Sequence, residues 1–374
     1  MKYTAKDIRS VKDYVKMPFL FNHWYVAGMG EEFDRTPKER TLLERSLVFY
    51  RTEAGELVAL QNRCLHRSFP LSESKLVGDN LVCGYHGARY DPEGTLVGLP
   101  GQDSCPKRKL RKYAIREIGP FAFIWMGEEG SEDESKLPDL PFLEDDKFRT
   151  IFGEKPLEGN YLLMQENLND LTHFSYLHAE TFGFTDEFIA LPTEITKEGT
   201  AVVLDRYNTN WEQVKLGMPA DVQEAVGERP IEKHDGGYSF SPGVFVGLAH
   251  LVVKNEDGED DVFHSYVMHY LTPESGGKTH YWYSISNDYA LDNDPYYQLI
   301  EAVSGVGFNE DVVAVKHMQH LLDNDKIEFE EMSLPGDRAG LLFRKVMLDW
   351  ANEEYSDAPA NEGSALDAPV QAVS

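Results

Sequence analysis

Two short stretches decide how this chain folds: Cys64-Leu65-His66 and, after sixteen further residues, Cys83-Gly84-Tyr85-His86. Each stretch supplies one thiol and one imidazole, so two loops together offer two cysteines and two histidines. A [2Fe–2S] cluster with mixed ligation needs this set, because two thiolates hold one iron and two neutral imidazoles hold the other. The pattern therefore predicts an iron–sulfur domain with Cys64, His66, Cys83 and His86 as cluster ligands.

The same four residues also suit tetrahedral Zn²⁺. Zinc motifs usually group cysteine with cysteine and histidine with histidine, whereas both loops here are mixed. We favour the cluster and keep zinc as the alternative. The third cysteine of the chain, Cys105, has no histidine at ligand spacing, so we expect it to be a structural or surface residue. An odd number of cysteines also argues against a disulfide scaffold.

The residues around the two loops read as a small all-β domain. Short apolar runs alternate with turn signals containing glycine, aspartate and asparagine, which is typical of β-strands joined by tight turns. The expected strands are 47–50, 57–60, 81–83, 95–97 and 122–126.

Changes in composition divide the rest of the chain. Residues 127–146 carry nine acids against one lysine, which indicates a solvated linker between domains. We expect five segments, the first two overlapping: an entry segment with a helix packed on the iron–sulfur domain (1–45), that domain itself (20–127), the linker (128–148), a larger mixed α and β domain (149–350) and a frayed tail (351–374). In the larger domain we expect helices at 160–178 and 295–323, the second interrupted near Gly305 and Gly307, and strands at 201–207, 244–253, 262–272 and 279–287.

Charge and hydropathy exclude several classes of protein. The formal net charge is −28, which disfavours nucleic acid and anionic membranes as partners because both need basic patches. No apolar run approaches the roughly 18 residues of a membrane-spanning helix. The first seventeen residues lack the apolar core of a signal peptide. We therefore expect a cytoplasmic protein.

A second group of metal-binding side chains lies in the stretch Asn167-Leu-Asn-Asp170-Leu-Thr-His173-Phe-Ser-Tyr-Leu-His178. On a helix, its four polar members would fall within an arc of roughly 140°. Two histidines plus one carboxylate form a triad that leaves positions open on Fe(II). The alternative is a polar helix face with satisfied histidines. The carboxylate of such a triad could come from Asp311 or the adjacent Glu310, far along the chain. From their spacing alone, both would be interpreted as solvated acids on a helix.

Both groups resemble the Rieske non-haem iron oxygenase family, through residues 62–67 and 83–94 and through the D-x-x-H-x-x-x-x-H motif at 170–178. The resemblance implies that His173 and His178 bind a mononuclear Fe(II), with Asp311 preferred over Glu310 as third ligand. Asp170 matches the acid that bonds His173 and, across a subunit boundary, the cluster ligand His86. Asn167 matches a polar residue near the iron.

The resemblance also implies an architecture and partners. Family members are α+β proteins with an N-terminal all-β Rieske domain and a catalytic domain whose curved antiparallel sheet is flanked by helices, in a helix-grip-like arrangement. They are commonly homotrimers that pass electrons between subunits. They use O2 and take electrons from NAD(P)H through a ferredoxin or a flavin/iron–sulfur reductase. No dinucleotide fingerprint is present in this sequence, which agrees with a separate reductase.

Residues 21–28 and 279–283 look like the vanillate demethylase branch of that family. The hypothesis is monooxygenation of a small aromatic substrate, as O-demethylation of a methoxylated aromatic acid with release of formaldehyde. Ring hydroxylation and aryl-methyl hydroxylation are the close alternatives, and an electron-transfer-only Rieske protein is the alternative class. Aromatic side chains on the later strands are candidates for an apolar pocket and histidines there for contact with a polar substituent, although core or surface positions are the commoner role for each: Phe245, Tyr266, Tyr270, Trp282, His250, His264, His269 and His280.

Overall fold

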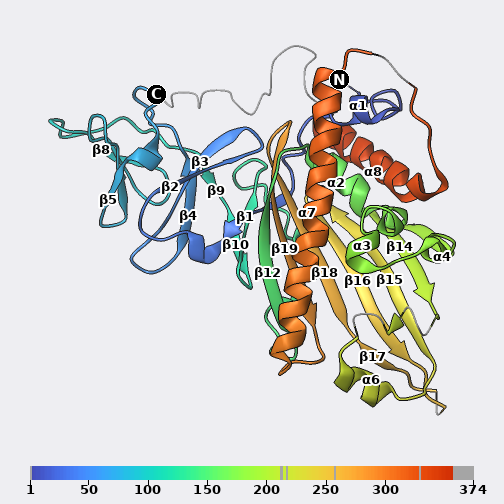
Figure 1. Ribbon diagram of the computed structural model, residues 1–374. Coiled ribbons are helices and arrows are strands. Elements are labelled where there is room, and N and C mark those ends of the chain that lie inside the picture. The colour runs from blue at the N-terminus through green and yellow to red at the C-terminus, as the bar shows by residue number, and fades with distance from the viewer. Residues whose placement is uncertain (1, 211–213, 216–217, 257, 328–329, 357–374) are drawn as a thin grey trace. The chain divides into compact units, whose positions relative to one another are not determined.

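The computed structural model describes residues 2–210, 214–215, 218–256, 258–327 and 330–356 (Figure 1). Its contacts divide into two compact units, and the division falls between Leu137 and Pro138. The first unit contains Phe19–Leu137, and the second contains Lys2–Pro18 together with Pro138–Glu353.

The first unit is built from short antiparallel strands. One sheet has the order β1-β11-β10, the second β2-β3-β4-β9 and the third β5-β6-β7-β8. Their bounds are β1 Trp24–Met29, β2 Lys38–Leu42, β3 Arg45–Arg51, β4 Leu57–Gln61, β5 Lys75–Val77, β6 Asn80–Val82, β7 Arg89–Tyr90, β8 Leu96–Gly98, β9 Lys112–Tyr113, β10 Ile115–Ile118 and β11 Phe121–Trp125. All five strands expected here have a counterpart.

Two apolar clusters form the core of this unit. One gathers aromatic and aliphatic side chains of β1, β3 and β11, among them Tyr25, Phe49 and Ile124. The other contains Leu60, Leu81, Tyr90 and both loop cysteines, so the cysteines sit in the packed interior and hold their loops against it. Short strands that bury one side in such clusters leave the loops between them as the exposed, functional part.

The second unit is a large antiparallel sheet with the order β12-β19-β18-β16-β15-β14-β13, to which β17 is added by pairing with β16. Its strands are β12 Arg149–Leu157, β13 Thr193–Glu198, β14 Ala201–Asn208, β15 Ile231–Ser241, β16 Val244–Val253, β17 Asp261–Phe263, β18 Ser265–Ser275 and β19 Lys278–Asn287. The sequence did not single out β12, β13 or β15. In β15, Gly236 and Gly237 would read as a turn, but a Cβ at either would strike a neighbouring strand's carbonyl, so close strand packing requires glycine there.

The second unit also contains helices. They are α1 Val11–Tyr14, α2 Tyr161–Leu168, α3 Ala179–Phe182, α4 Asp186–Ile189, α6 Ala220–Val226, α7 Asp294–Asn324 and α8 Arg338–Tyr355. The long α7 and α2 pack against the sheet, while α8 packs on α2 (Figure 1). The ring of Phe308 in α7 contacts His269 of β18 and Tyr283 of β19, which fixes the long helix across these strands. The expected α+β class is confirmed.

Four expectations about the local structure are wrong. The stretch 160–178 is not one helix, because Asp170 is extended and its side chain accepts a hydrogen bond from the Thr172 N–H, starting a short 3-10 turn instead. The late helix α7 is not interrupted: at Gly307 a Cβ would meet the ring of Phe182, so this glycine makes room for packing.

The strand expected at 262–272 is broken at His264, whose N–H donates to Asp288 (2.7 Å). Residues 351–355 continue α8, so the tail cannot start at 351; residues 357–374 lie outside the described part.

The N-terminal segment also differs from expectation. We expected residues 1–45 to pack with the iron–sulfur domain, but Lys2–Pro18 group with the second unit. The Val11 N–H donates to Glu331 (2.9 Å), and the carbonyl of Val15 accepts from Asn160 (3.0 Å). These partly buried polar contacts explain the grouping, because the sequence alone shows no partner for the segment.

Candidate metal centres

The two loops of the first unit carry the four predicted cluster ligands. The first loop follows β4 and the second joins β6 to β7. Both cysteines are buried, with Cys64 and Cys83 each 3% exposed, while both imidazoles are exposed. The Nδ1 atoms of His66 and His86 lie 3.2 Å apart. One loop therefore meets the other with thiols inside and imidazoles outside.

Backbone hydrogen bonds hold the second loop in shape, and a hydroxyl lies near one of the sulfur atoms. The Cys83 N–H donates to Ala88 O (2.8 Å), and the Gly87 N–H donates to Cys83 O (2.9 Å). Gly87 has φ +75, a left-handed conformation that favours glycine. The Tyr90 hydroxyl lies 3.3 Å from Cys64 Sγ. Burial raises the pKa of the Cys83 thiol, and hydrogen bonds from the N–H groups of Tyr85 and His86 partly offset that rise.

These residues fit a Rieske cluster. Two ring nitrogens that face each other at hydrogen-bond distance converge on a single point, as two ligands of one iron would. Two buried thiols suit the other iron: N–H groups are directed at Cys83 and the Tyr90 hydroxyl lies beside Cys64, and hydrogen bonds to sulfur tune such clusters. Cys105 donates instead to the Leu96 carbonyl (3.2 Å), in keeping with the structural role expected of it.

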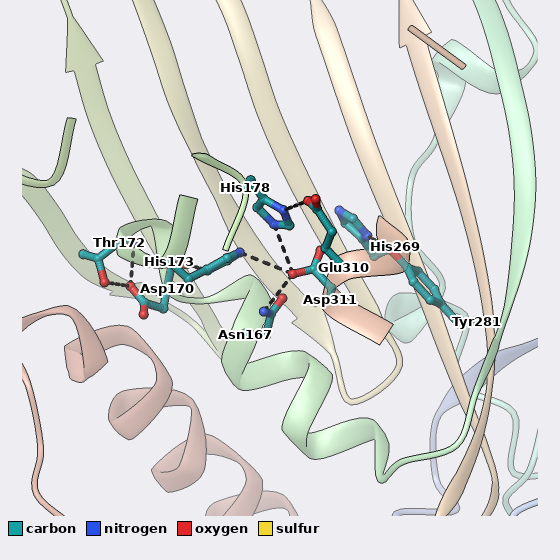
Figure 2. Close-up of polar contacts among 9 residues, drawn as sticks. All are labelled: Asn167, Asp170, Thr172, His173, His178, His269, Tyr281, Glu310 and Asp311. Atoms are coloured by element: carbon teal, nitrogen blue, oxygen red, sulfur yellow. Dashed lines mark hydrogen bonds and ion pairs between the residues drawn. The ribbon is translucent and has the colours of Figure 1, made fainter. Parts of the chain in front are cut away.

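The second candidate centre lies in the second unit, where three separate segments meet. His173 sits in the 3-10 turn Leu171–Ser175, His178 directly precedes α3, and Asp311 lies in the middle of α7. The ligand atoms of the three residues all lie within 4.8 Å of one another. Asp311 Oδ1 is 3.1 Å from His178 Nε2 and 3.5 Å from His173 Nε2 (Figure 2). Among the described residues, this is the one group with such metal-binding geometry.

The other nitrogen of each imidazole already has a partner. His178 Nδ1 lies 2.7 Å from Glu310 Oε2, and His173 Nδ1 contacts the backbone carbonyl of Asp170 (Figure 2). Metal-binding histidines almost always donate their second N–H to a carboxylate or a carbonyl, which fixes the tautomer. Both Nε2 atoms are therefore left with their lone pairs directed at Asp311 Oδ1, and the donor set fits a divalent iron with open positions.

Burial and charge act in opposite directions on the two imidazoles. Burial lowers the pKa of His173. At His178 burial also acts to lower the pKa, but hydrogen bonds and charge from Asp311 and Glu310 raise it overall. A 4% exposed carboxylate beside a 1% exposed imidazole is costly to bury without a cation between them.

Asn167, at the end of α2, directs its amide to the same carboxylate. Its Nδ2 donates to Asp311 Oδ1 (3.0 Å), and its buried Oδ1 has no hydrogen-bond partner. This position agrees with a polar residue close to the iron, as the resemblance implied.

Asp170 is placed differently from the expectation. Its main-chain oxygen, not its carboxylate, contacts His173. The carboxylate Oδ1 instead accepts from the Thr172 N–H (2.7 Å) and hydroxyl (2.6 Å). The reason is local: an extended residue that begins a helical turn directs its side chain to the N–H two residues later. The contact to His86 of another subunit concerns an assembly and stays a prediction.

A cavity of about 620 Å³ opens beside this centre. His173, His178, Asp311 and Asn167 form part of its wall. The remainder is mostly apolar, with rings from the segment after His173, from β16 and from α7: Phe174, Phe182, Phe184, Phe245 and Phe308. Of the strand residues considered from the sequence, Phe245 and His269 line the cavity. The others are not among its lining residues: Tyr266, Tyr270, Trp282, His250, His264 and His280.

Reasoning from the sequence missed the supporting role of Glu310 and named His269 only as one of several candidates for the pocket. Glu310, weighed only as a rival ligand to Asp311, supports His178. His269, 5% exposed, has its Nδ1 2.7 Å from the Tyr281 hydroxyl and lies in the cavity wall beside Phe308. Glu310 directly precedes the candidate ligand Asp311 on a helix. This adjacency was the feature of the sequence that could have indicated its supporting role.

Known proteins share both halves of this arrangement. Residues 157–353 match the family model "Vanillate O-demethylase oxygenase C-terminal domain", and residues 23–114 match "Rieske [2Fe-2S] domain". The dicamba O-demethylase oxygenase component of Stenotrophomonas maltophilia is 29% identical over 74% of this chain and 81% of its own. The vanillate O-demethylase oxygenase subunit of a Pseudomonas species (strain HR199) is 27% identical over 91% and 98%. A crystal structure of dicamba monooxygenase bound to dicamba has a TM-score of 0.76 at 25% identity, covering 91% of this chain and 99% of that one.

The fold and the two centres define a class of enzyme, the oxygenase component of a Rieske non-haem iron system. Within that class, the chain belongs to the vanillate O-demethylase oxygenase family. The predicted cofactors, a [2Fe–2S] cluster and a mononuclear iron, are confirmed, and with them O2 as co-substrate and electron supply through a separate reductase. The zinc and electron-transfer-only alternatives are wrong. In the described part of the chain, no helix is long and apolar enough to cross a membrane.

Proposed function

We propose that this oxygenase monooxygenates an aromatic substrate, with O-demethylation of a methoxyaryl group as its principal reaction. The proposal rests on one observation: the three candidate iron ligands, His173, His178 and Asp311, form part of the wall of an apolar cavity that is large enough for an aromatic ligand. Ligand pockets of about 300–1,000 Å³ with apolar walls and few polar groups are typical of small-molecule sites. The names of relatives that act on vanillate and dicamba support the same substrate class.

The reaction balances as follows. A methoxyaryl substrate, O2, two electrons and two protons give a hemiacetal and water; the hemiacetal then collapses to a phenol and formaldehyde. When bound, the cluster supplies electrons one at a time and the iron activates O2. The chain's own residues orient the substrate: rings of Phe174, Phe245 and Phe308 exclude water and hold the methoxy carbon toward the metal-binding wall.

The residue roles follow from the contacts above. We assign Cys64, His66, Cys83 and His86 to the cluster and His173, His178 and Asp311 to the iron. In this assignment Glu310 and the Asp170 carbonyl orient the two imidazoles, and Asn167 holds the Asp311 carboxylate. The homotrimer, in which Asp170 would reach a neighbouring subunit's His86, and the cytoplasmic location remain predictions. The exposure of His66 and His86 is compatible with electron exchange at that surface.

A screen of methoxylated and methylated aromatic compounds with a surrogate reductase tests the reaction. We expect substrate-dependent O2 uptake with an equal amount of formaldehyde. A hydroxylated ring without formaldehyde would favour ring hydroxylation, and an aryl alcohol from a methyl substrate would favour aryl-methyl hydroxylation. Light scattering of the purified holoenzyme measures the predicted trimer independently.

A further inference from the structure

The cavity has a second end, on the part of the sheet away from the metal-binding wall. At the metal end, Phe245 of β16 contacts His269, which lies beside the candidate iron ligands (Figure 2). Leu251, six residues later in β16, also lines the cavity. Strands rise about 3.3 Å per residue, so these two positions are separated by roughly 20 Å along the strand. Lys233 of β15 pairs in register with Leu251 and lines the cavity at this second end.

Aromatic rings line the wall between the two ends. The Phe182 ring lies 4.8 Å from the His178 ring and 6.4 Å from the Phe184 ring, measured between centroids. Lys233 Nζ lies 5.7 Å from the centroid of Phe184. All four side chains line the cavity. An aromatic ligand that lies along these rings therefore directs one substituent toward the metal end and the opposite one toward Lys233.

Hydroxyl groups lie at the same end as the lysine. The Tyr296 hydroxyl donates to the Tyr289 hydroxyl (3.2 Å), and both residues line the cavity together with Ser265. Burial raises the pKa of Tyr289, and the bond with Tyr296, the charge of Lys233 and a bond with Ser265 offset part of that rise. The ammonium is thus close enough to act on this hydroxyl. A cation with hydroxyl donors beside it suits an anionic oxygen ligand.

The lysine keeps donors for a ligand although it has an acidic neighbour. Among the described lining residues there is no arginine and a single lysine, Lys233, whose Nζ is 2.7 Å from Asp235 Oδ1. An ammonium has three N–H donors, and this oxygen accepts one of them. The Lys233 side chain is 24% exposed and that of Asp235 10%, so the cation is the more accessible member of the pair.

Asp235 is also shared with a second cation. Burial lowers the pKa of the Arg206 guanidinium, and the charges of Asp235 and, to a smaller extent, Asp170 act against that lowering. One further acid lines the cavity away from the metal centre, Glu180, but it is exposed to solvent, which screens its charge. The charge presented to a ligand at this end is therefore chiefly that of the lysine.

We propose that Lys233 is a specificity-determining residue that binds a carboxylate or sulfonate group of an aromatic substrate, at the end of the cavity away from the iron. The inference rests on the proposed function, because the methoxy group that is oxidised lies at the other end of the same molecule. It narrows the substrate class to aromatic anions. The ammonium supplies charge and donors, the hydroxyls of Tyr289 and Ser265 lie beside it, and Phe184 packs on the aromatic ring.

Two matched pairs of ligands differ in charge at one end: 4-methoxybenzoate with 4-methoxybenzamide, and the longer 4-methoxycinnamate with 4-methoxycinnamamide. Dissociation constants for the oxidised, full-length holoenzyme are measured by equilibrium dialysis without reductase, so turnover plays no part. We expect the acids to bind about tenfold tighter than their amides, because hydrogen bonds between charged groups are the stronger kind. A preference in one pair alone shows which length reaches Lys233. Amides that bind as tightly as the acids in both pairs overturn the proposal.

Variants of the lysine locate the effect. Lys233→Met removes the charge and keeps an unbranched side chain, so the acids should weaken about tenfold while the amides stay within about twofold. Lys233→Arg keeps a cation and should retain the preference for acids. Lys254→Met is the matched control, since this lysine pairs with Glu232 and Asp260 and is not among the lining residues. Equal weakening of acid and amide by Lys233→Met, or the same loss in Lys254→Met, contradicts the assignment.

Asp235→Asn tests the sign of the charge effect. Removing the negative charge beside the ammonium should tighten the binding of the acids about threefold and leave the amides unchanged, because the amides carry no charge. Urea unfolding shows whether the variant is folded. Unchanged or weaker binding of the acids by folded Asp235→Asn protein contradicts the proposal, and the Lys233 variants decide the question without it.

The two proposals fail separately. If formaldehyde is released from methoxyaryl compounds but Lys233→Met leaves the binding of the acids unchanged, the oxygenase function stands and the role of Lys233 is wrong. If the acids bind through Lys233 but no methoxyaryl compound yields formaldehyde, the anion site stands and the demethylation is wrong.

Discussion

Glu310 Oε2 lies 2.7 Å from Nδ1 of His178, on the side of the imidazole ring opposite to Asp311. Adjacent acids on one helix thus contact the two nitrogens of one ring. The Thr181 hydroxyl donates to the other oxygen of Glu310 (2.7 Å), which holds this carboxylate in place. Both Glu310 and Asp311 face His178, although their roles differ. For this reason the sequence alone could not show which of the two acids is the metal ligand.

Glu310→Ala should lower iron affinity about 10- to 100-fold, because supporting partners of metal-binding histidines have effects of that size. Glu310→Gln is the matched control: its amide oxygen can still accept from His178, so we expect a smaller loss. Iron affinity is measured by titrating apoprotein with Fe(II), with the visible spectrum of the cluster as an internal reference. Equal losses in both variants would point to charge rather than ring orientation.

Asp311→Ala should remove the mononuclear iron and abolish O2 uptake, since it deletes the one carboxylate that faces both Nε2 atoms. The [2Fe–2S] spectrum should be unchanged, because the cluster loops lie in the other unit. The iron content measured by elemental analysis should therefore fall by about one iron per chain. Retained iron in this variant, combined with its loss in Glu310→Ala, would reverse the roles of the two acids.

Cys64→Ser should eliminate the cluster absorbance and labile sulfide, because a buried thiolate ligand is lost. Cys105→Ser provides the control, since that thiol only donates to a carbonyl, and should keep a normal spectrum. If Cys105→Ser also lost the cluster absorbance, the assignment of the cluster ligands to the two loops would be wrong.

Arg344→Met should destabilise the second unit by about 3–5 kcal/mol, the usual cost of leaving a buried charge unpaired. Arg344 Nη2 donates to Glu166 Oε2 (2.8 Å), and Arg344 is 6% exposed, so the pair ties α8 to α2. The double variant Glu166→Leu/Arg344→Met should recover most of the loss. Urea unfolding measures both, and no recovery in the double variant would mean that packing, not charge, dominates.

His23 should make stability depend on pH. Burial, followed by the charge of Lys136, lowers its pKa to about 3. Between that value and the unfolded pKa of about 6.5, only the unfolded chain takes up the proton, so stability is complete above pH 6.5 and falls as pH falls. From pH 7 to pH 5 the loss is about 2 kcal/mol. His23→Gln should remove this part of the slope in urea unfolding; parallel slopes for the two proteins would contradict the argument.

Local sequence patterns predicted those features of the site that depend on the spacing of residues along the chain. The second Cys/His loop joins two paired strands, β6 and β7, and the first follows β4 about twenty residues earlier, so the four residues are close in sequence and in space. The break at Asp170 was not visible, because helix periodicity describes a face without showing whether a side chain will cap a new turn. Nor was β15 recognised, since Gly236 and Gly237 serve a close approach between strands that no local rule reveals.

By itself, the sequence determined the class of enzyme, the two cofactors and their short-range ligands, since ligand chemistry requires particular residue types at fixed separations. Only the tertiary structure decided how Asp311 meets His178 across 133 residues and His173 across 138, how the acids divide their roles, and which side chains line the cavity. These relations depend on the register of the strands and the position of α7 across them, and packing between distant segments sets both.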